Sequence, residues 1–184
     1  MRIVSGTHKS KRIYAPKNLP VRPTTDMAKE SLFNILNNDY YFDEIRVLDL
    51  FSGTGNISYE FASRGTDHIL SVDQNLNCIR FIQQTAEELG FKAITTLKAD
   101  AFEFLTKHKQ EYDIIFADAP YDLEGLDSIV EKVFSQKLLS KFGVLILEHP
   151  KEQDFSELPY FSNKRRYGNV NFSFFEWKEE KDEK

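Results

Sequence analysis

Short apolar strands alternate with helix-length segments through the middle of this chain, and no other feature limits the possible folds as strongly. Strands are predicted at residues 46–50, 68–73, 94–97, 112–117 and 143–147. Amphipathic helices are predicted at 57–65, 75–89, 101–107 and 126–134. Because parallel strands need crossover connections of this length, we expect an α/β fold with a mostly parallel sheet and helices on both faces. A last strand at 172–177 is predicted to be antiparallel, since no long crossover precedes it.

The length of the chain predicts one domain. A chain of 184 residues with 41% hydrophobic content can bury one core but is short for two ordinary domains, so residues 1–184 are expected to form a single unit. The single Cys78 cannot form an intramolecular disulfide, and no apolar run reaches the length of a signal peptide or a membrane span. We therefore expect a cytoplasmic protein with no membrane partner.

Positive charge is concentrated near the start of the chain, although the net charge is −5. The segment 1–22 contains no acid and six cations, which are Arg2, Lys9, Lys11, Arg12, Lys17 and Arg22. This basic extension predicts contact with phosphate groups. A second basic cluster at 164–166 precedes the last strand, whereas residues 176–184 form a mixed-charge tail that we interpret as solvated.

Aspartates lie at the ends of four predicted strands, namely Asp49, Asp73, Asp100 and Asp118. Ligands of open α/β sheets bind beyond the carboxyl ends of the strands, so we expect these carboxylates to surround a ligand. A strand-end aspartate is also a common helix N-cap, and Asp100 would serve well in that role. Four caps in succession are the less favoured interpretation.

The loop 51–55, with sequence Phe-Ser-Gly-Thr-Gly, follows the first strand. Its glycines allow the backbone to turn sharply and to approach a ligand closely. A dinucleotide fingerprint would require glycine or alanine where this chain has Ser58, and Asp49 nearby disfavours a pyrophosphate. S-adenosylmethionine, which carries an amino group and a sulfonium but no phosphate, suits this charge better. Asp73 would then accept hydrogen bonds from the ribose hydroxyls.

Two motifs and the N-terminal region carry a resemblance to a known family. Residues 49–55 and Asp-Ala-Pro-Tyr at 118–121 resemble the first and fourth motifs of class I, S-adenosylmethionine-dependent amino-methyltransferases. Residues 22–34, with 2–6 ahead of them, resemble the RsmD type of bacterial 16S ribosomal RNA guanine-N2 methyltransferase, and the similarity covers essentially the whole chain. Ala119 stands where this family usually has a proline, but its backbone carbonyl is unchanged.

The resemblance implies a Rossmann-like, mostly parallel seven-stranded sheet with one antiparallel strand, preceded by a small basic β-hairpin. It implies a monomer that acts on 16S ribosomal RNA in the small subunit or its assembly intermediate, and no metal. The implied cofactor-binding residues are Asp49, Phe51, Gly53, Gly55, Asp73, Asp100, Ala101 and Asp118. The implied substrate-binding residues are Arg2, Lys9, Lys11, Arg12, Arg22, Thr24, Thr25 and Tyr121. Thr25 serves equally well as a plain helix N-cap.

The catalytic residues implied by the fourth motif are Asp118, Pro120 and Tyr121. The lone pair of an exocyclic base amine is delocalised into the ring, so the amine is a poor nucleophile. The carboxylate of Asp118 and a backbone carbonyl near Pro120 would accept its two protons and direct the lone pair at the methyl group. The ring of Tyr121 would stack on the extruded base.

Two other functions stay open at this point. A methyltransferase for adenine N6 in DNA, or for another base amine, shares the fourth motif, but it usually carries a target-recognition region for which this chain has little room. A non-catalytic RNA-binding protein with the same fold would bind RNA without turnover. Activity of an Asp118 variant separates these two classes.

Overall fold

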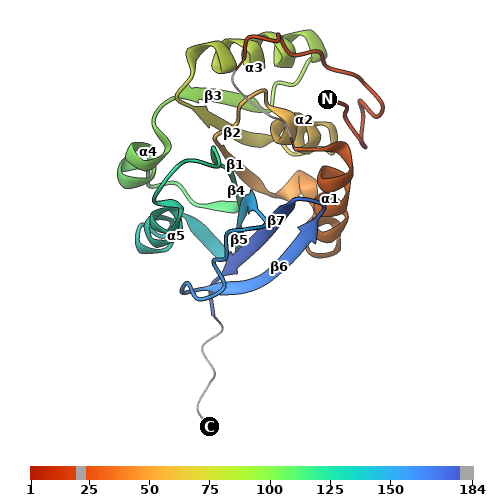
Figure 1. Ribbon diagram of the computed structural model, residues 1–184. Coiled ribbons are helices and arrows are strands. Elements are labelled where there is room, and N and C mark those ends of the chain that lie inside the picture. The colour runs from red at the N-terminus through yellow and green to blue at the C-terminus, as the bar shows by residue number, and fades with distance from the viewer. Residues whose placement is uncertain (20–23, 179–184) are drawn as a thin grey trace.

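The predicted alternation builds a seven-stranded sheet with helices on both faces (Figure 1). The computed structural model describes residues 1–19 and 24–178. The strands are β1 (Arg46–Leu50), β2 (His68–Asp73), β3 (Ile94–Lys98), β4 (Tyr112–Asp118), β5 (Leu139–Pro150), β6 (Phe161–Tyr167) and β7 (Val170–Glu176). The helices are α1 (Asp26–Asp39), the 3-10 turn η1 (Phe42–Glu44), α2 (Asn56–Ser63), α3 (Leu76–Leu89), α4 (Ala101–Lys107) and α5 (Leu126–Ser135).

The sheet has the strand order β3-β2-β1-β4-β5-β7-β6. The first five strands in this order are parallel to one another, and β7 is antiparallel to both of its neighbours. The expectation of a mostly parallel sheet with one antiparallel strand is therefore confirmed. After β1 the chain adds β2 and β3 on one side of that strand. It then crosses to the other side of β1 and adds β4, so the strand order reverses between β1 and β4.

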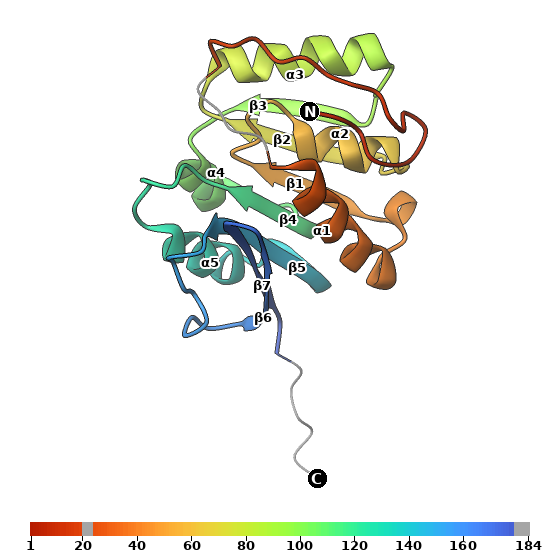
Figure 2. The same ribbon diagram turned by 45° about the vertical axis from the view of Figure 1, so that its right-hand side comes forward.

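The two faces of the sheet bury separate apolar clusters, and Figure 2 shows α4 and α5 on one face and α1 and α2 on the other. Leu48 and Leu50 of β1 pack with α4 and α5 on one face, whereas Val47 packs with α1 and α2 on the other. This alternation is the period-two pattern of a strand that is buried on both sides. None of the described helices is long and apolar enough to cross a membrane.

The last strands differ from the sequence prediction. Strand β5 runs from residue 139 to 150 instead of 143 to 147, and β6 was not predicted at all. Five successive residues of β6 are exposed, from Ser162 to Arg166, so it has no alternating apolar pattern to recognise. The tryptophan at 177 follows β7 and packs against Phe134 and Tyr160, and its indole N–H donates to the carbonyl of Leu139 at 3.2 Å.

The expected N-terminal hairpin is reduced to a single antiparallel bridge between Arg2 and Arg12. Around this bridge, backbone hydrogen bonds join Ile3 to residues 10 and 11 and Met1 to Ile13, and the turn between them has positive φ at Gly6 and Ser10. Gly6 is required here, because a Cβ atom would lie 1.8 Å from the carbonyl oxygen of Ser63. Two isoleucines at 3 and 13 are buried with side chains of α2 and α3, which fixes the segment on the body of the protein.

A buried ion pair joins α1 to α2. The ammonium of Lys29 lies 3.1 Å from a carboxylate oxygen of Glu60, and neither side chain is exposed. Lys29 also donates to the side-chain oxygen of Asn56 at 2.8 Å and to the backbone carbonyl of Arg2 at 2.6 Å. Burial lowers the pKa of Lys29, and the adjacent Glu60 carboxylate acts in the opposite direction.

The carboxylate of Glu60 holds the N-terminal segment as well. It accepts the backbone N–H groups of Val4 at 2.8 Å and Ser5 at 3.0 Å, and the guanidinium of Arg64 at 2.9 Å. Every oxygen of this buried charge is therefore paired, which is the condition for keeping a charge inside a protein. The same two side chains thus fix the relative positions of α1, α2 and the first residues of the chain.

Replacing Lys29 with Met should lower the free energy of unfolding by about 3 to 5 kcal/mol, because buried Glu60 would lose one of its two counter-charges, the one that pairs with its Oε2 atom. Urea denaturation followed by circular dichroism measures this. The matched control is Lys132→Met on the surface of α5, which should change stability by less than about 0.5 kcal/mol. Equal stability of the two variants would contradict this role for the pair.

Candidate active site

A cavity of about 390 Å³ opens at the point where the strand order reverses. It lies beyond the carboxyl ends of β1, β2 and β4, where ligands of open α/β sheets bind. Its volume is in the range of sites for small molecules and cofactors. The predicted site residues that line it are Thr24, Asp49, Phe51, Gly53, Asp73, Asp118, Pro120 and Tyr121.

The glycine-rich loop after β1 forms one wall of this cavity. Phe51 and Gly53 both have positive φ, which turns the loop back toward β2. The N–H of Gly53 donates to the carboxylate of Asp73 at 2.9 Å. Gly55 does not line the cavity, but it starts α2 with φ +82°, and a Cβ there would lie 2.7 Å from the ring of Tyr59. The first glycine therefore shapes the cavity, and the second lets the helix start.

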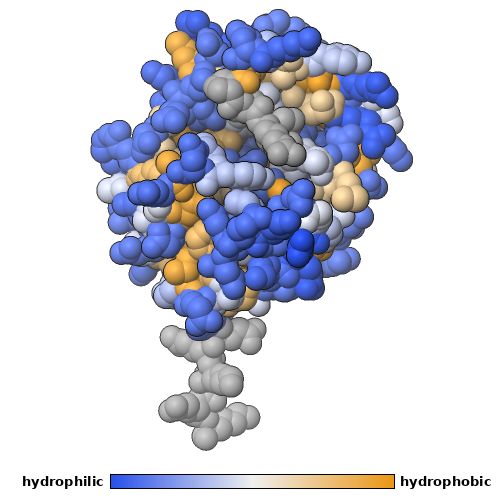
Figure 3. Space-filling view, in the orientation of Figure 1, coloured by the Kyte–Doolittle hydropathy of each residue, from blue (hydrophilic) through white to orange (hydrophobic). Residues whose placement is uncertain are grey.

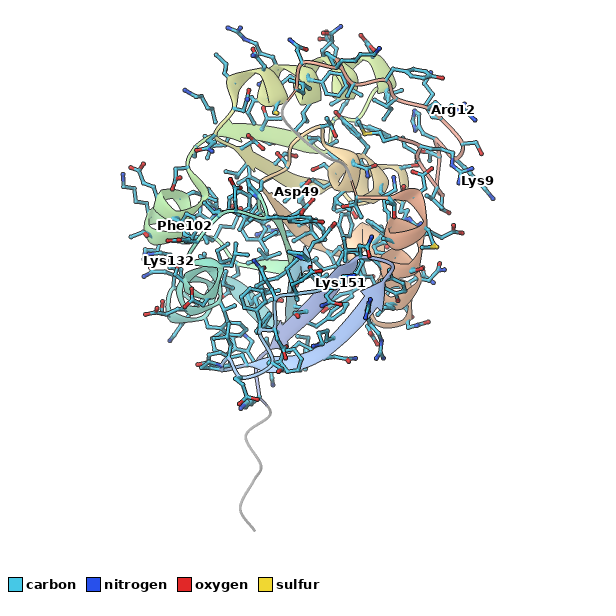
Figure 4. The ribbon with its side chains drawn as sticks, viewed as in Figure 1. Lys9, Arg12, Asp49, Phe102, Lys132 and Lys151 are labelled. Carbon is cyan, nitrogen blue, oxygen red and sulfur yellow. The ribbon has the colours of Figure 1, made fainter. Side chains whose placement is uncertain are left out.

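Asp49 is buried and lines the cavity, and Figure 4 shows it near the centre of the molecule. Its carboxylate accepts the hydroxyl of Ser58 at 2.6 Å, and that hydroxyl also lies 2.7 Å from the hydroxyl of Ser71. Burial raises the pKa of Asp49 to about 7; the Ser58 hydrogen bond opposes the shift, and Asp73 adds to it. Ser58, which breaks the dinucleotide pattern, thus serves to hold this carboxylate.

Asp73, at the end of β2, and Asp100, which follows β3, have different surroundings from Asp49. Asp73 accepts the N–H of Gly53 with one oxygen and the N–H of Asn75 at 2.8 Å with the other. Each carboxylate oxygen can accept further hydrogen bonds, so Asp73 stays available to ligand hydroxyls. Asp100 instead caps α4 by accepting the N–H of Glu103 at 2.9 Å.

Neither Asp100 nor Ala101 lines the cavity, which corrects the expectation that four strand-end carboxylates surround it. The side chain of Asp100 turns toward the first turn of its own helix, where the unpaired N–H groups attract it. Three carboxylates therefore face the ligand site from strand ends, and a contact of Asp100 or Ala101 with an adenine ring stays a prediction.

A second carboxylate lies beside Asp118. Glu148 is the register partner of Asp118 on the neighbouring strand β5, and its side chain is buried. Burial, together with the charges of Glu148 and Asp49, raises the pKa of Asp118 well above its usual range. Sequence reasoning missed Glu148. The signal was its position at the end of the fifth strand, by the same rule that selected the aspartates.

Thr24 connects this carboxylate pair to the helices. Its hydroxyl donates to Glu148 at 2.6 Å, and its backbone carbonyl accepts the side-chain amide of Asn56 at 2.9 Å. Asn56 in turn accepts from Lys29 of the buried ion pair. Thr25, by contrast, is exposed and caps α1 through the N–H of Ala28, so its N-cap role is present in the structure.

The remaining predicted substrate residues lie at the surface. Arg2 pairs with Asp26 at 3.3 Å, and Lys9, Lys11 and Arg12 are exposed. Figure 4 shows Lys9 and Arg12 at the outer edge of the molecule, pointing away from Asp49. The basic extension thus presents its charges to the outside. Arg22 lies outside the described residues.

The structure has a mostly parallel sheet whose strand order reverses between β1 and β4, with a glycine-rich loop and carboxylates at that point. These features define a class I methyltransferase fold, and solved structures agree. A protein of Escherichia coli provisionally named a methyltransferase has a TM-score of 0.85 and 19% identity, over 97% of this chain and 99% of that one. A Podospora anserina methyltransferase solved with S-adenosylhomocysteine has a TM-score of 0.68 and 15% identity, over 85% and 80%. At these identities the likeness shows the fold alone.

The chain belongs to the family described as conserved hypothetical protein 95, whose model matches residues 1–176. A Bacillus subtilis relative provisionally named an rRNA methyltransferase is 32% identical, over 85% of this chain and 86% of its own. Ribosomal RNA small subunit methyltransferase D of Buchnera aphidicola is 27% identical, over 80% and 75%. The resemblance to the RsmD type of rRNA methyltransferases is thereby confirmed.

Replacing Thr24 with Val keeps the shape of the side chain but removes the hydroxyl that donates to Glu148. We expect the free energy of unfolding to fall by about 1 to 3 kcal/mol, because a buried carboxylate loses a hydrogen bond. Chemical denaturation measures the loss. Thr95→Val, at an exposed position of β3, is the control and should be nearly neutral. A Thr24 variant as stable as this control would show that the bond contributes nothing.

Proposed function

We propose that this protein transfers a methyl group from S-adenosylmethionine to the exocyclic N2 amine of a guanine in 16S ribosomal RNA of the small subunit. The observation that carries the proposal is the cavity itself, which joins the glycine loop and Asp49 to Asp118 and Tyr121. The residues proposed to bind the cofactor and those proposed to bind the base thus line one cavity. We also propose that the protein acts as a single-domain monomer, in the cytoplasm, where its RNA substrate is found.

The residues of the cavity fit the cofactor. Asp49 and Asp73 supply carboxylates for a ligand with positive charge and ribose hydroxyls, and the positive φ angles of the loop expose backbone close to the ligand. When bound, S-adenosylmethionine supplies an electrophilic methyl group on a sulfonium ion. Among the described residues no group of three or more histidine, cysteine, aspartate or glutamate side chains is suited to hold a metal ion.

Asp118 and a backbone carbonyl activate the amine. Asp118 accepts one proton of the amine in a hydrogen bond, which localises the nitrogen lone pair and stabilises the positive charge that develops on nitrogen. The carbonyl of Pro120 already accepts the N–H of Leu123 at 2.9 Å, so the carbonyl of Ala119 is the better acceptor for the second proton. Alanine supplies that carbonyl as well as proline does.

Tyr121 holds the base. Its side chain lines the cavity and is 44% exposed, so the ring can be reached by a base. Stacking on an aromatic side chain contributes about 1 to 3 kcal/mol per base in single-strand binders. The base must leave its own helix or loop before it can reach Asp118, and Tyr121 offsets part of that cost. The relatives' names support ribosomal RNA of the small subunit as the substrate, and guanine is the base that the resemblance to the RsmD type implies.

Replacing Asp118 with Ala should lower methyl transfer at least about 100-fold, because the main acceptor for the amine is lost. The assay is transfer of a labelled methyl group to small ribosomal subunits that lack their own base methylation, with mass mapping of the product. Calorimetric affinity for S-adenosylmethionine should change far less than turnover, because Asp49 and Asp73 remain to bind the cofactor. Asp127→Ala, an acid in the first turn of α5, is the control and should keep wild-type turnover.

Each other outcome contradicts one part of the proposal. Full turnover by the Asp118 variant would remove this residue from the mechanism. Label in DNA or in another RNA, with none in 16S RNA, would contradict the substrate. No transfer by the wild-type protein to any nucleic acid would contradict the enzymatic function and favour an RNA-binding protein.

The affinity for S-adenosylmethionine should depend on pH through Asp49. Its pKa in the free protein is raised to about 7, so below this pH the carboxyl is protonated and must lose its proton before it can attract a cation. Affinity should be constant above pH 8 and fall by up to about tenfold per unit below pH 7. Isothermal titration calorimetry measures this, and Asp49→Asn should bind weakly with a flat profile. A steep profile in that variant would assign the titration to another group.

A further inference from the structure

We propose that the exposed edge strand β6 is a second RNA-binding surface, which holds phosphates of the strand on either side of the target base. The surface, called here the β6 edge, consists of Lys164, Arg165 and Arg166. The inference rests on the proposed function for its substrate. It does not involve the basic N-terminal extension, which lies against α2 and α3 on another part of the molecule.

The charges of the β6 edge are largely uncompensated. The hydrogen bonds of Arg165 and Arg166 go to neutral oxygens, the side chain of Asn163 at 3.2 Å and the carbonyl of Gly168 at 3.2 Å. Lys164 pairs with Asp154 at 3.1 Å, but that carboxylate is exposed, and exposed pairs are weak. Three consecutive exposed cations on a chain with net charge −5 therefore form a local positive surface.

The sheet register places this surface on the same row as the active site. Asp118 pairs with Glu148, Glu148 with Phe172, and Phe172 with Arg165, across four adjacent strands. At about 4.8 Å between neighbouring strands, the backbone of Arg165 lies roughly 14 Å from that of Asp118. Nucleotides next to a base bound at Asp118 can reach across this distance along the carboxyl end of the sheet.

The orientation of β6 also fits. Tyr167 and Pro150 both pair with Val170, so β6 and β5 end at the same side of the sheet, which is the side of the cavity. Figure 3 shows a hydrophilic surface over β6, and in Figure 1 no helix covers the outer edge of this strand. The β6 edge is therefore open to a nucleic-acid strand on the side of the sheet where the cavity lies.

One further cation lies between the cavity and the β6 edge. Lys151 follows β5, and its N–H donates to the carbonyl of Asn169 in the turn between β6 and β7. Figure 4 shows Lys151 beside the ends of these strands. Its ammonium is 3.8 Å from the exposed carboxylate of Glu152, a contact too long and too exposed to neutralise it strongly. Positive charge is thus present along the path from the cavity to the edge.

Cations on an edge strand have a second possible role, since they hinder pairing with strands of other molecules. The two roles predict different defects. A strand that only guards the edge would self-associate when its charges are removed, with unchanged affinity for RNA. A phosphate-binding strand would lose affinity and salt dependence while the protein stays monomeric.

The test is a variant that carries Lys164→Ser, Arg165→Ser and Arg166→Ser. Its affinity for small ribosomal subunits lacking base methylation is measured by filter binding from low to high salt, together with KM for the same subunits. We expect affinity to fall at least about tenfold at physiological salt, and the slope of log affinity against log salt to decrease by about 2, because two to three phosphate contacts are lost. Calorimetric affinity for S-adenosylmethionine should stay at the wild-type value.

The matched control removes three lysines on α4, on α5 and in the loop after α4, with Lys107→Ser, Lys132→Ser and Lys109→Ser. It loses the same charge, so equal binding defects in the two variants would show a net-charge effect and overturn the proposal. Wild-type binding by the β6 variant, with self-association in gel filtration, would overturn it in favour of edge protection. Because binding is measured without turnover, a wild-type protein that methylates no RNA would contradict the proposed function and still leave this comparison decisive.

Discussion

The buried pair of Lys29 and Glu60 is the interaction on which the rest of the site depends. A charge inside a protein is tolerated only when every donor and acceptor is paired, so these two side chains force α1, α2 and the N-terminal segment into one arrangement. Asn56 extends the network from Lys29 to Thr24, and Thr24 extends it to Glu148 beside Asp118. A continuous set of hydrogen bonds therefore runs from the outer helices to Glu148, the register partner of the predicted catalytic Asp118.

The electrostatics of the cavity follow from its position. Asp49, Asp118 and Glu148 lie where three parallel strands end, and each loses solvation there because the sheet and its helices exclude water. Such a group of acids is costly in an empty site and favourable when a cation enters. The raised pKa values of Asp49 and Asp118 express this cost, and they suit a site for a positively charged cofactor and a developing ammonium.

The sequence predicted the elements that have a strong local signal. The alternation of apolar strands and amphipathic helices, and the loop of glycines after β1, depend on residues close in the chain. Strand β6 was missed because its exposed polar residues carry no periodic pattern, and it is a strand only because β7 pairs with it. Glu148 could have been selected from its position after the fifth predicted strand, but its bond to Thr24 joins positions 124 residues apart, and only the folded chain brings them together. Asp100 caps α4, and sequence could not separate this role from a ligand contact because the two look alike there.

The packing of Trp177 has a practical consequence. It is the only tryptophan of the chain, and it is fixed at the start of β5, at the end of the sheet opposite the cavity. Its contacts with Phe134 and Tyr160 hold together α5, the loop before β6 and the end of β7. Its fluorescence should therefore report loss of the folded core while staying insensitive to ligands, which makes it an intrinsic probe that separates unfolding from binding in one sample.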